Sequence, residues 1–242
     1  MLVRLRLSIS TWNEEKRLAM TDASQLNGPE LAPASGGPAK QLVIFLHGVG
    51  ADGNDLIGLA PYFQQVLPDA RFISPNAPFR FDMAPMGYQW FSLNEFTEEA
   101  RLAGAANAAP LLNAFIDAEL AKDGLTEENL ALIGFSQGAM MSLHVGLRRV
   151  RQMAAIVSYS GILVGKELLE EEIKSKPPIL LTHGTADPVL PFAFLAEAEK
   201  GLKELGLNVS THERPGLPHG IDDECIRLGQ KFLMEAFGVT PN

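Results

Sequence analysis

The sequence predicts a single α/β domain built around a mainly parallel β-sheet with helices on both faces. From about residue 40 onward, short apolar runs of strand length alternate with longer stretches of helical periodicity. Runs that are apolar at nearly every position are typical of strands buried on both faces, as in a parallel sheet. A chain of 242 residues is long enough for one large domain with a substantial core.

Six segments have the apolar pattern expected of strands. The first five are nearly continuous apolar runs, whereas the last alternates more and therefore predicts an edge strand. In chain order they are residues 41–46, 71–74, 130–135, 154–159, 179–182 and 207–212.

Five segments between these strands have helical spacing of their apolar residues. The second contains Pro110, which predicts a kink because proline removes an intrahelical hydrogen bond. The charge-rich residues 166–176 are expected to form a solvated helix or loop. The five predicted helices are residues 54–67, 98–120, 137–150, 192–205 and 222–237. This strand–helix alternation favours one α/β domain.

The N-terminal segment, residues 1–39, has no sustained period and ends in a Pro/Ser/Gly cluster at residues 33–38. Such a cluster is typical of a loop. We therefore expect residues 1–39 to be a flexible leader and residues 40–242 to be the folded domain that carries the function.

Composition excludes several classes of protein. A net charge of −9 disfavours nucleic acid and anionic membrane partners, and no apolar run is long enough to predict integral membrane association. The single cysteine, Cys225, excludes an internal disulfide and a cysteine metal cage, and it fits a cytoplasmic location. The histidines lack metal-ligand spacing, so we expect no metal and no cofactor.

The clearest chemical motif is Gly134-Phe135-Ser136-Gln137-Gly138, which matches G-x-S-x-G. A predicted strand precedes it and a predicted helix follows it, as in a nucleophile elbow. This strand–turn–helix context makes a chance match of five residues improbable. Ser136 is therefore the candidate nucleophile.

A serine nucleophile needs an adjacent base, which an acid orients. In this architecture the order along the chain is serine, acid, histidine. His219 lies in a Pro/Gly-rich loop between the last strand and the last helix, and Asp187 directly follows the strand at 179–182. The alternatives are a surface histidine and a turn aspartate before Pro188. We predict His219 as the base and Asp187 as the acid.

The glycine-rich segment Gly48-Val49-Gly50-Ala51-Asp52-Gly53 follows the first strong strand. Its turn can offer a backbone N–H to an oxyanion, so we assign the two oxyanion donors to the amides of Val49 and Gln137. The same letters spell the dinucleotide fingerprint G-x-G-x-x-G. However, no acidic residue ends the next strand, which makes a nucleotide-binding oxidoreductase a remote alternative.

The segment Pro78–Leu93 is rich in Phe, Met and Trp. Methionine suits a deformable binding surface, so this segment is a candidate lining for an acyl pocket. Ordinary core packing is an equally weighted interpretation, above all for Trp90. The candidate pocket residues are Met83, Met86, Trp90, Leu163 and Val189.

Four segments together resemble the phospholipase/carboxylesterase family of α/β-hydrolases, which includes the acyl-protein thioesterases. They are residues 45–53, 134–139, 183–191 and 218–220, within a span from Leu42 to Phe237. The resemblance implies an α/β-hydrolase fold and a serine esterase with Ser136, Asp187 and His219 as triad. It also implies Val49 and Gln137 as oxyanion donors, and a possible homodimer.

The predicted function is hydrolysis of short- to medium-chain carboxylic esters, a small-molecule substrate class, through a covalent acyl-enzyme. An acyl-protein thioesterase or lysophospholipase would use the same machinery. A serine peptidase shares the triad, but no added domain that would gate peptides is evident. A binding module without activity would leave three well-placed catalytic residues unused.

Overall fold

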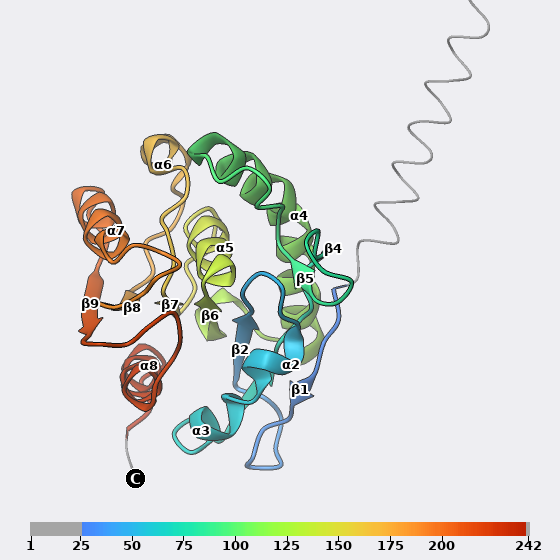
Figure 1. Ribbon diagram of the computed structural model, residues 1–242. Helices are drawn as coiled ribbons and strands as arrows, with labels where there is room; N and C mark the ends of the chain where they lie inside the picture. Colours follow the sequence, from blue (N-terminus) through green and yellow to red (C-terminus); the bar gives the residue numbers. More distant parts are fainter. Residues whose placement is uncertain (1–25, 241–242) are drawn as a thin grey trace, which may run out of the picture.

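The computed structural model describes residues 26–240, which form a three-layer α/β structure (Figure 1). The central sheet has the strand order β1-β3-β2-β6-β7-β8-β9, and every neighbouring pair is parallel except β1–β3. The strands are β1 (Glu30–Leu31), β2 (Gln41–Leu46), β3 (Ala70–Ile73), β6 (Leu130–Phe135), β7 (Ala155–Tyr159), β8 (Ile179–Gly184) and β9 (Val209–Arg214). The mainly parallel sheet is confirmed, with β9 at one edge as expected.

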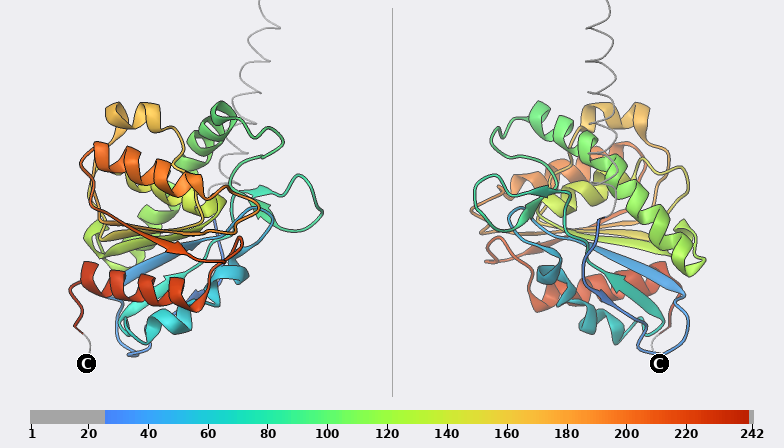
Figure 2. Two further views of the ribbon diagram at one scale, coloured as in Figure 1. Left: turned by 60° about the vertical axis from the view of Figure 1, so that its left-hand side comes forward. Right: turned by 90° about the vertical axis from the view of Figure 1, so that its right-hand side faces the viewer.

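Helices cover both faces of this sheet (Figure 2). On one face lie α2 (Gly53–Ile57), α3 (Ala60–Gln64) and α8 (Asp223–Ala236). On the other lie α4 (Glu98–Asp123), α5 (Gln137–Gly146), α6 (Lys166–Glu172) and α7 (Ala193–Glu204). Side chains of β2 alternate between the two cores: Leu42 and Ile44 face the α5 side, whereas Val43 faces the α8 side. The continuous apolar run therefore reflects burial on both faces.

The predicted helix at residues 54–67 is two short helices instead of one. Gly58 caps α2, and α3 begins with Pro61 in its first turn. Proline is favoured there because the first N–H groups of a helix have no intrahelical partner. By contrast, α4 continues through Pro110 as far as Asp123 and ends at Gly124, whose φ is 66°.

The N-terminal boundary expected at residue 40 is too late. Strand β1 pairs with β3, with Glu30 opposite Ile73, and Leu26 is buried. Arg71 on β3 binds the Glu30 carboxylate at 2.9 Å and the Asp123 carboxylate at 2.7 Å. Residues 26–39 therefore belong to the folded domain, while residues 1–25 of the expected leader lie outside the described residues.

The strand order reverses direction at β2, whose neighbours are β3 and β6. In open α/β sheets, binding sites form at the carboxyl ends of the strands beside such a reversal. A small hairpin of β4 (Phe79–Arg80) and β5 (Tyr88–Gln89) projects near this edge (Figure 2). No helix within residues 26–240 combines the length and the apolar character needed to cross a bilayer.

Candidate active site

Ser136 occupies a sharp turn between β6 and α5. Its φ of 54° lies in the left-handed region, which non-glycine residues rarely adopt. The two glycines of the motif permit this turn: a Cβ on Gly138 would overlap the Leu46 carbonyl oxygen, and one on Gly134 would overlap the Gly138 carbonyl oxygen. Strain kept by close packing at one residue is typical of a functional position.

The structure brings the three predicted triad residues together. The Ser136 Oγ lies 3.0 Å from His219 Nε2, and His219 Nδ1 lies 2.7 Å from Asp187 Oδ2. Both distances are those of good hydrogen bonds. The three residues thus form a continuous hydrogen-bonded chain across the carboxyl ends of three strands.

The Asp187 carboxylate is held in one orientation. Its side chain has 0% exposure, and Oδ1 accepts the N–H groups of Val189 at 2.8 Å and Leu190 at 2.9 Å. Burial raises the pKa of the Asp187 carboxyl, but the bonds from His219, Leu190 and Val189 outweigh burial and hold that pKa below its usual value. Oδ2 is thereby left facing the imidazole as an ionised acceptor.

The loop that carries His219 is tied to the loop that carries Asp187. The Ala186 N–H donates to the Leu217 carbonyl at 3.1 Å, and the Gly216 N–H donates to Thr185 Oγ1 at 2.9 Å. The ring of Phe135, next to the serine, lies 4.8 Å from the His219 ring. These contacts fix the imidazole between the serine and the acid.

The glycine-rich loop after β2 lies directly against the serine turn. A Cβ on Gly48 would sit 3.4 Å from Ser136 Cβ. Buried His47 supports the loop: the Ala77 N–H donates to Nε2 at 2.9 Å, so Nδ1 carries the proton and donates to the Gly48 carbonyl at 2.7 Å. Burial lowers the His47 pKa and keeps this ring neutral. His47 is therefore a structural acceptor and donor, not a second base.

The two amides predicted as oxyanion donors belong to Val49 and Gln137, which directly follow Gly48 and Ser136, the two residues in close contact. Within residues 26–240, neither the Val49 N–H nor the Gln137 N–H donates to a protein acceptor. The Gln137 amide also stands at the N-terminus of α5, where the helix dipole is positive. Both donors are therefore available to a ligand.

The Gln137 side chain has a role that the sequence analysis did not anticipate. Its Oε1 accepts the backbone N–H of Trp90 at 2.8 Å, and its Nε2 donates to the Phe91 carbonyl at 2.7 Å. It therefore fastens the segment after the β4–β5 hairpin to the serine turn. The sequence does not indicate this contact because residues 91 and 137 are far apart in the chain. It forms only when the segment after β5 packs against the start of α5.

The structure does not gather the five predicted pocket residues into one site. Trp90 is fully buried in the core and donates from Nε1 to the His47 carbonyl, so its assignment to the pocket surface is wrong. Met83 and Met86 are 72% and 77% exposed on the hairpin. Leu163 is buried, and Val189 is exposed beside Asp187. Their common role as a lining stays a prediction.

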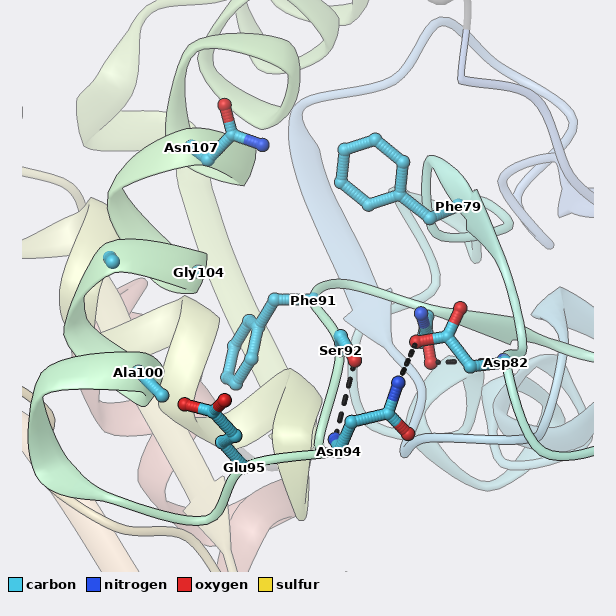
Figure 3. A pocket seen from close by; sticks show the side chains of 11 residues that line it. Phe79, Asp82, Phe91, Ser92, Asn94, Glu95, Ala100, Gly104 and Asn107 are labelled. Carbon is cyan, nitrogen blue, oxygen red and sulfur yellow. Dashed lines mark hydrogen bonds between the residues drawn. The ribbon is translucent and has the colours of Figure 1, made fainter.

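A pocket of about 650 Å³ lies between the hairpin segment and the first turns of α4 (Figure 3). Gln89 and Phe91 line it, and these two residues flank Trp90, which Gln137 holds. The remaining lining mixes aromatic, small, amide and acidic side chains: Phe79, Asp82, Ser92, Asn94, Glu95, Ala100, Ala103, Gly104 and Asn107. Sequence analysis identified the segment but not this partly polar character.

A mainly parallel sheet with a strained serine between a strand and a helix, followed along the chain by an acid and a histidine, defines the class of α/β-hydrolases. Comparison with known proteins places the chain within this class. The phospholipase/carboxylesterase family matches residues 30–236, and the chain belongs to this family. It is a carboxylesterase-type hydrolase within a family of carboxylesterases and acyl-protein thioesterases.

Individual relatives agree with this placement. The chain is 31% identical to acyl-protein thioesterase 1 of Schizosaccharomyces pombe, over 81% of this chain and 91% of the relative. It is 29% identical to the esterase YpfH of Escherichia coli, over 81% and 83%. Among solved structures, esterase PE8 has 43% identity and a TM-score of 0.84, over 88% of this chain and 99% of that one. The nucleotide-binding alternative receives no support from these matches.

Proposed function

We propose that the protein hydrolyses short- to medium-chain carboxylic esters with Ser136 as nucleophile, His219 as base and Asp187 as acid. The observation that carries this proposal is the continuous hydrogen-bonded chain from Ser136 Oγ through His219 to Asp187. A serine hydroxyl is a weak nucleophile by itself and needs such a base.

In the acylation step, His219 Nε2 accepts the Ser136 proton while Oγ attacks the ester carbonyl. Since Nδ1 donates to Asp187 Oδ2, Nε2 is the free acceptor in the neutral ring. The tetrahedral oxyanion is held by the amides of Val49 and Gln137, and one such donor is worth about 2.7–4 kcal/mol to a transition state. Asp187 stabilises the imidazolium without taking its proton.

Collapse of the tetrahedral intermediate breaks the bond to the leaving alcohol, which takes the proton from His219. A water molecule then gives a proton to His219 and attacks the acyl-enzyme through the same oxyanion geometry. Release of the carboxylic acid restores the Ser136 hydroxyl.

The decisive experiment compares p-nitrophenyl butyrate hydrolysis by the wild type, Ser136→Ala and Ser142→Ala. Ser142 is a matched control because it is a buried serine on α5 whose hydroxyl, among the residues that the structure describes, bonds only the Ala139 carbonyl. We expect Ser136→Ala to lose turnover with an unchanged circular dichroism spectrum, and Ser142→Ala to keep it. Comparable rates in Ser136→Ala and wild type would overturn the assignment.

We place the acyl chain in the pocket beside the hairpin, whose wall Gln137 fastens to the serine turn, and this pocket favours the shorter acyl range. Asp82 and Glu95 line it, and burying a long alkyl chain against carboxylates would desolvate their charges at a cost. We expect kcat/KM to peak at the shorter esters in a series of p-nitrophenyl esters from acetate to palmitate. A maximum at palmitate would contradict this assignment of chain length.

Thioester hydrolysis is the second candidate function because several relatives bear the name acyl-protein thioesterase. Ser136 would attack a thioester in the same geometry. Matched butyryl ester and butyryl thioester substrates separate the two activities by their kcat/KM. A homodimer of this chain is a separate proposal. Light scattering tests it, and a result that shows only monomer would refute it.

A further inference from the structure

A second imidazole, that of His183, lies beside the triad acid. His183 Nε2 is 3.3 Å from Asp187 Oδ2 and 3.0 Å from the Leu190 carbonyl oxygen. Both the His183 ring and the Asp187 carboxylate are almost completely buried, with side-chain exposures of 1% and 0%. The hydrolytic mechanism described above makes no use of this ring.

The hydrogen-bond partners of His183 determine which nitrogen carries its proton. A carbonyl oxygen only accepts, so Nε2 must donate to Leu190. The same N–H lies close to Oδ2, the oxygen that accepts from His219. A buried donor near a buried carboxylate stabilises the ionised form far more than it would in water.

Leu190 links the two side chains through its backbone. Its N–H donates to Asp187 Oδ1, while its carbonyl accepts from His183. His183 itself stands in β8, where it pairs with Glu213 of β9, and its ring packs edge-on against Phe192 at 6.1 Å. The Leu190 end of the loop that carries the acid is therefore anchored to a side chain of the sheet.

We infer that His183 is a positioning residue, which holds the turn 187–190 so that Asp187 Oδ2 faces His219 and contributes its Nε2–H dipole to that carboxylate. The inference rests on the proposed function, since positioning the acid matters only if Asp187 serves His219. In the chain order of a nucleophile-elbow hydrolase the histidine base follows the acid, so the position of His183 before Asp187 indicates no catalytic role. Only the fold shows that its ring turns back toward Asp187.

A positioning role predicts a loss in turnover without a loss in substrate binding. His183→Leu keeps the bulk of the buried side chain but removes the donor. We expect its kcat to fall roughly ten- to hundredfold, less than the ~10⁴-fold that loss of the acid's role costs in a comparable triad, with KM unchanged. His183→Gln restores an N–H near the position of Nε2 and should recover most of the loss.

The test measures kcat, KM and Tm for these two variants, for His144→Leu, and for His183→Leu in an Asp187→Asn background. His144 is a matched control because it is a buried histidine of α5, and within residues 26–240 its side chain has no hydrogen bond to Ser136, Asp187 or His219. If His183 acts through Asp187, the double variant has the same kcat as Asp187→Asn alone.

Three outcomes overturn the inference. The first is a wild-type kcat in His183→Leu. The second is that His183→Leu lowers kcat by the same factor in the Asp187→Asn background as in the wild type. The third is that kcat falls as far in His183→Gln as in His183→Leu. Failure of the proposed function would look different, because Ser136→Ala would then retain wild-type turnover. If the first of these outcomes is accompanied by a fall in Tm that His144→Leu matches, His183 is a packing residue.

Discussion

Asp187 is a charged group whose side chain has no exposed surface, so its charge must be stabilised entirely by neighbouring donors. The N–H groups of Val189, Leu190 and His219 donate hydrogen bonds to it, and His183 Nε2 lies 3.3 Å from Oδ2. In Asp187→Asn, the amide can present its NH₂ to His219 and stabilise the wrong tautomer. We expect kcat for p-nitrophenyl butyrate to fall by about 10⁴-fold, as in a comparable triad.

The matched control for this variant is Asp222→Asn at the same edge of the sheet. Asp222 pairs with Arg214 and caps α8 through the Cys225 N–H. The Arg214 bond holds the Asp222 pKa far below its usual value. Loss of the ion pair between Asp222 and Arg214 should lower Tm, while kcat stays near the wild-type value. A fall in kcat equal to that of Asp187→Asn would contradict the assignment of Asp187 as the acid.

A pH effect on stability is expected from His144. Burial, assisted by Arg148, lowers the His144 pKa from 6.5 to about 4. Between these values the unfolded chain binds a proton that the folded chain does not, so stability falls as the pH drops from 6.5 toward 4. The loss attributable to this residue is on the order of 3 kcal/mol. His144→Leu should flatten this part of the urea-unfolding stability curve, and identical slopes in both proteins would contradict the prediction.

At the residue scale, the juxtaposition of polar side chains was easier to predict than packing. Ser136, Asp187 and His219, which hydrogen bonds join in the structure, could be selected because a local motif and a fixed chain order constrain them. Trp90 could not be placed, since the letters of an aromatic segment do not say which rings turn inward. His183 required knowledge of the side-chain direction at the end of β8.

At the scale of elements, α8 is held against the sheet by a close approach at Gly229. A Cβ there would overlap the Tyr159 hydroxyl, which donates to the Cys225 carbonyl at 2.9 Å. Gly229→Ala should lower the free energy of unfolding by about 1–3 kcal/mol through overpacking. Because the Tyr159 carbonyl also accepts the Ser136 N–H at 2.9 Å, a displacement of Tyr159 would reach the serine turn, and kcat should fall as well. Gly220→Ala is the control, since a Cβ there has no neighbour within 4 Å.

Elements with a clear period were predicted well, and short elements were not. The strands at 41–46 and 130–135 have the predicted bounds because continuous apolar runs mark them. Strands β1, β4 and β5 have two residues each, too few to show any alternation. Their positions depend on pairing partners that are distant in the chain.

At the scale of the whole molecule, Arg71 connects the N-terminal strand, the sheet and the end of α4. Its nearly buried guanidinium pairs with Glu30, Glu119 and Asp123. Arg71→Ala leaves the poorly exposed Asp123 carboxylate without its partner and Glu119 with Lys122 at 3.8 Å, and we expect it to cost about 3–5 kcal/mol in urea unfolding.

The control for Arg71 is Lys40→Ala, which breaks the pair with Asp69. Both side chains of that pair are considerably more exposed, and such surface pairs contribute little to stability. An equal fall in the free energy of unfolding in Arg71→Ala and Lys40→Ala would mean that burial does not strengthen the contribution of the Arg71 ion pairs to stability. The expected kcat is that of wild type in both.

The pairing of β2 with β6 has a consequence for how activity appears during refolding. Leu46 lies opposite Gly134, so the loop with Val49 and the turn with Ser136 come together only when two distant stretches of chain pair. Contacts between distant segments form slowly, because the chain between them must first lose its freedom. Helices can form earlier without bringing the oxyanion donors to the serine. In a refolding experiment, the time at which esterase activity returns would therefore report when β2 and β6 pair. We expect activity to return later than the helical circular dichroism signal.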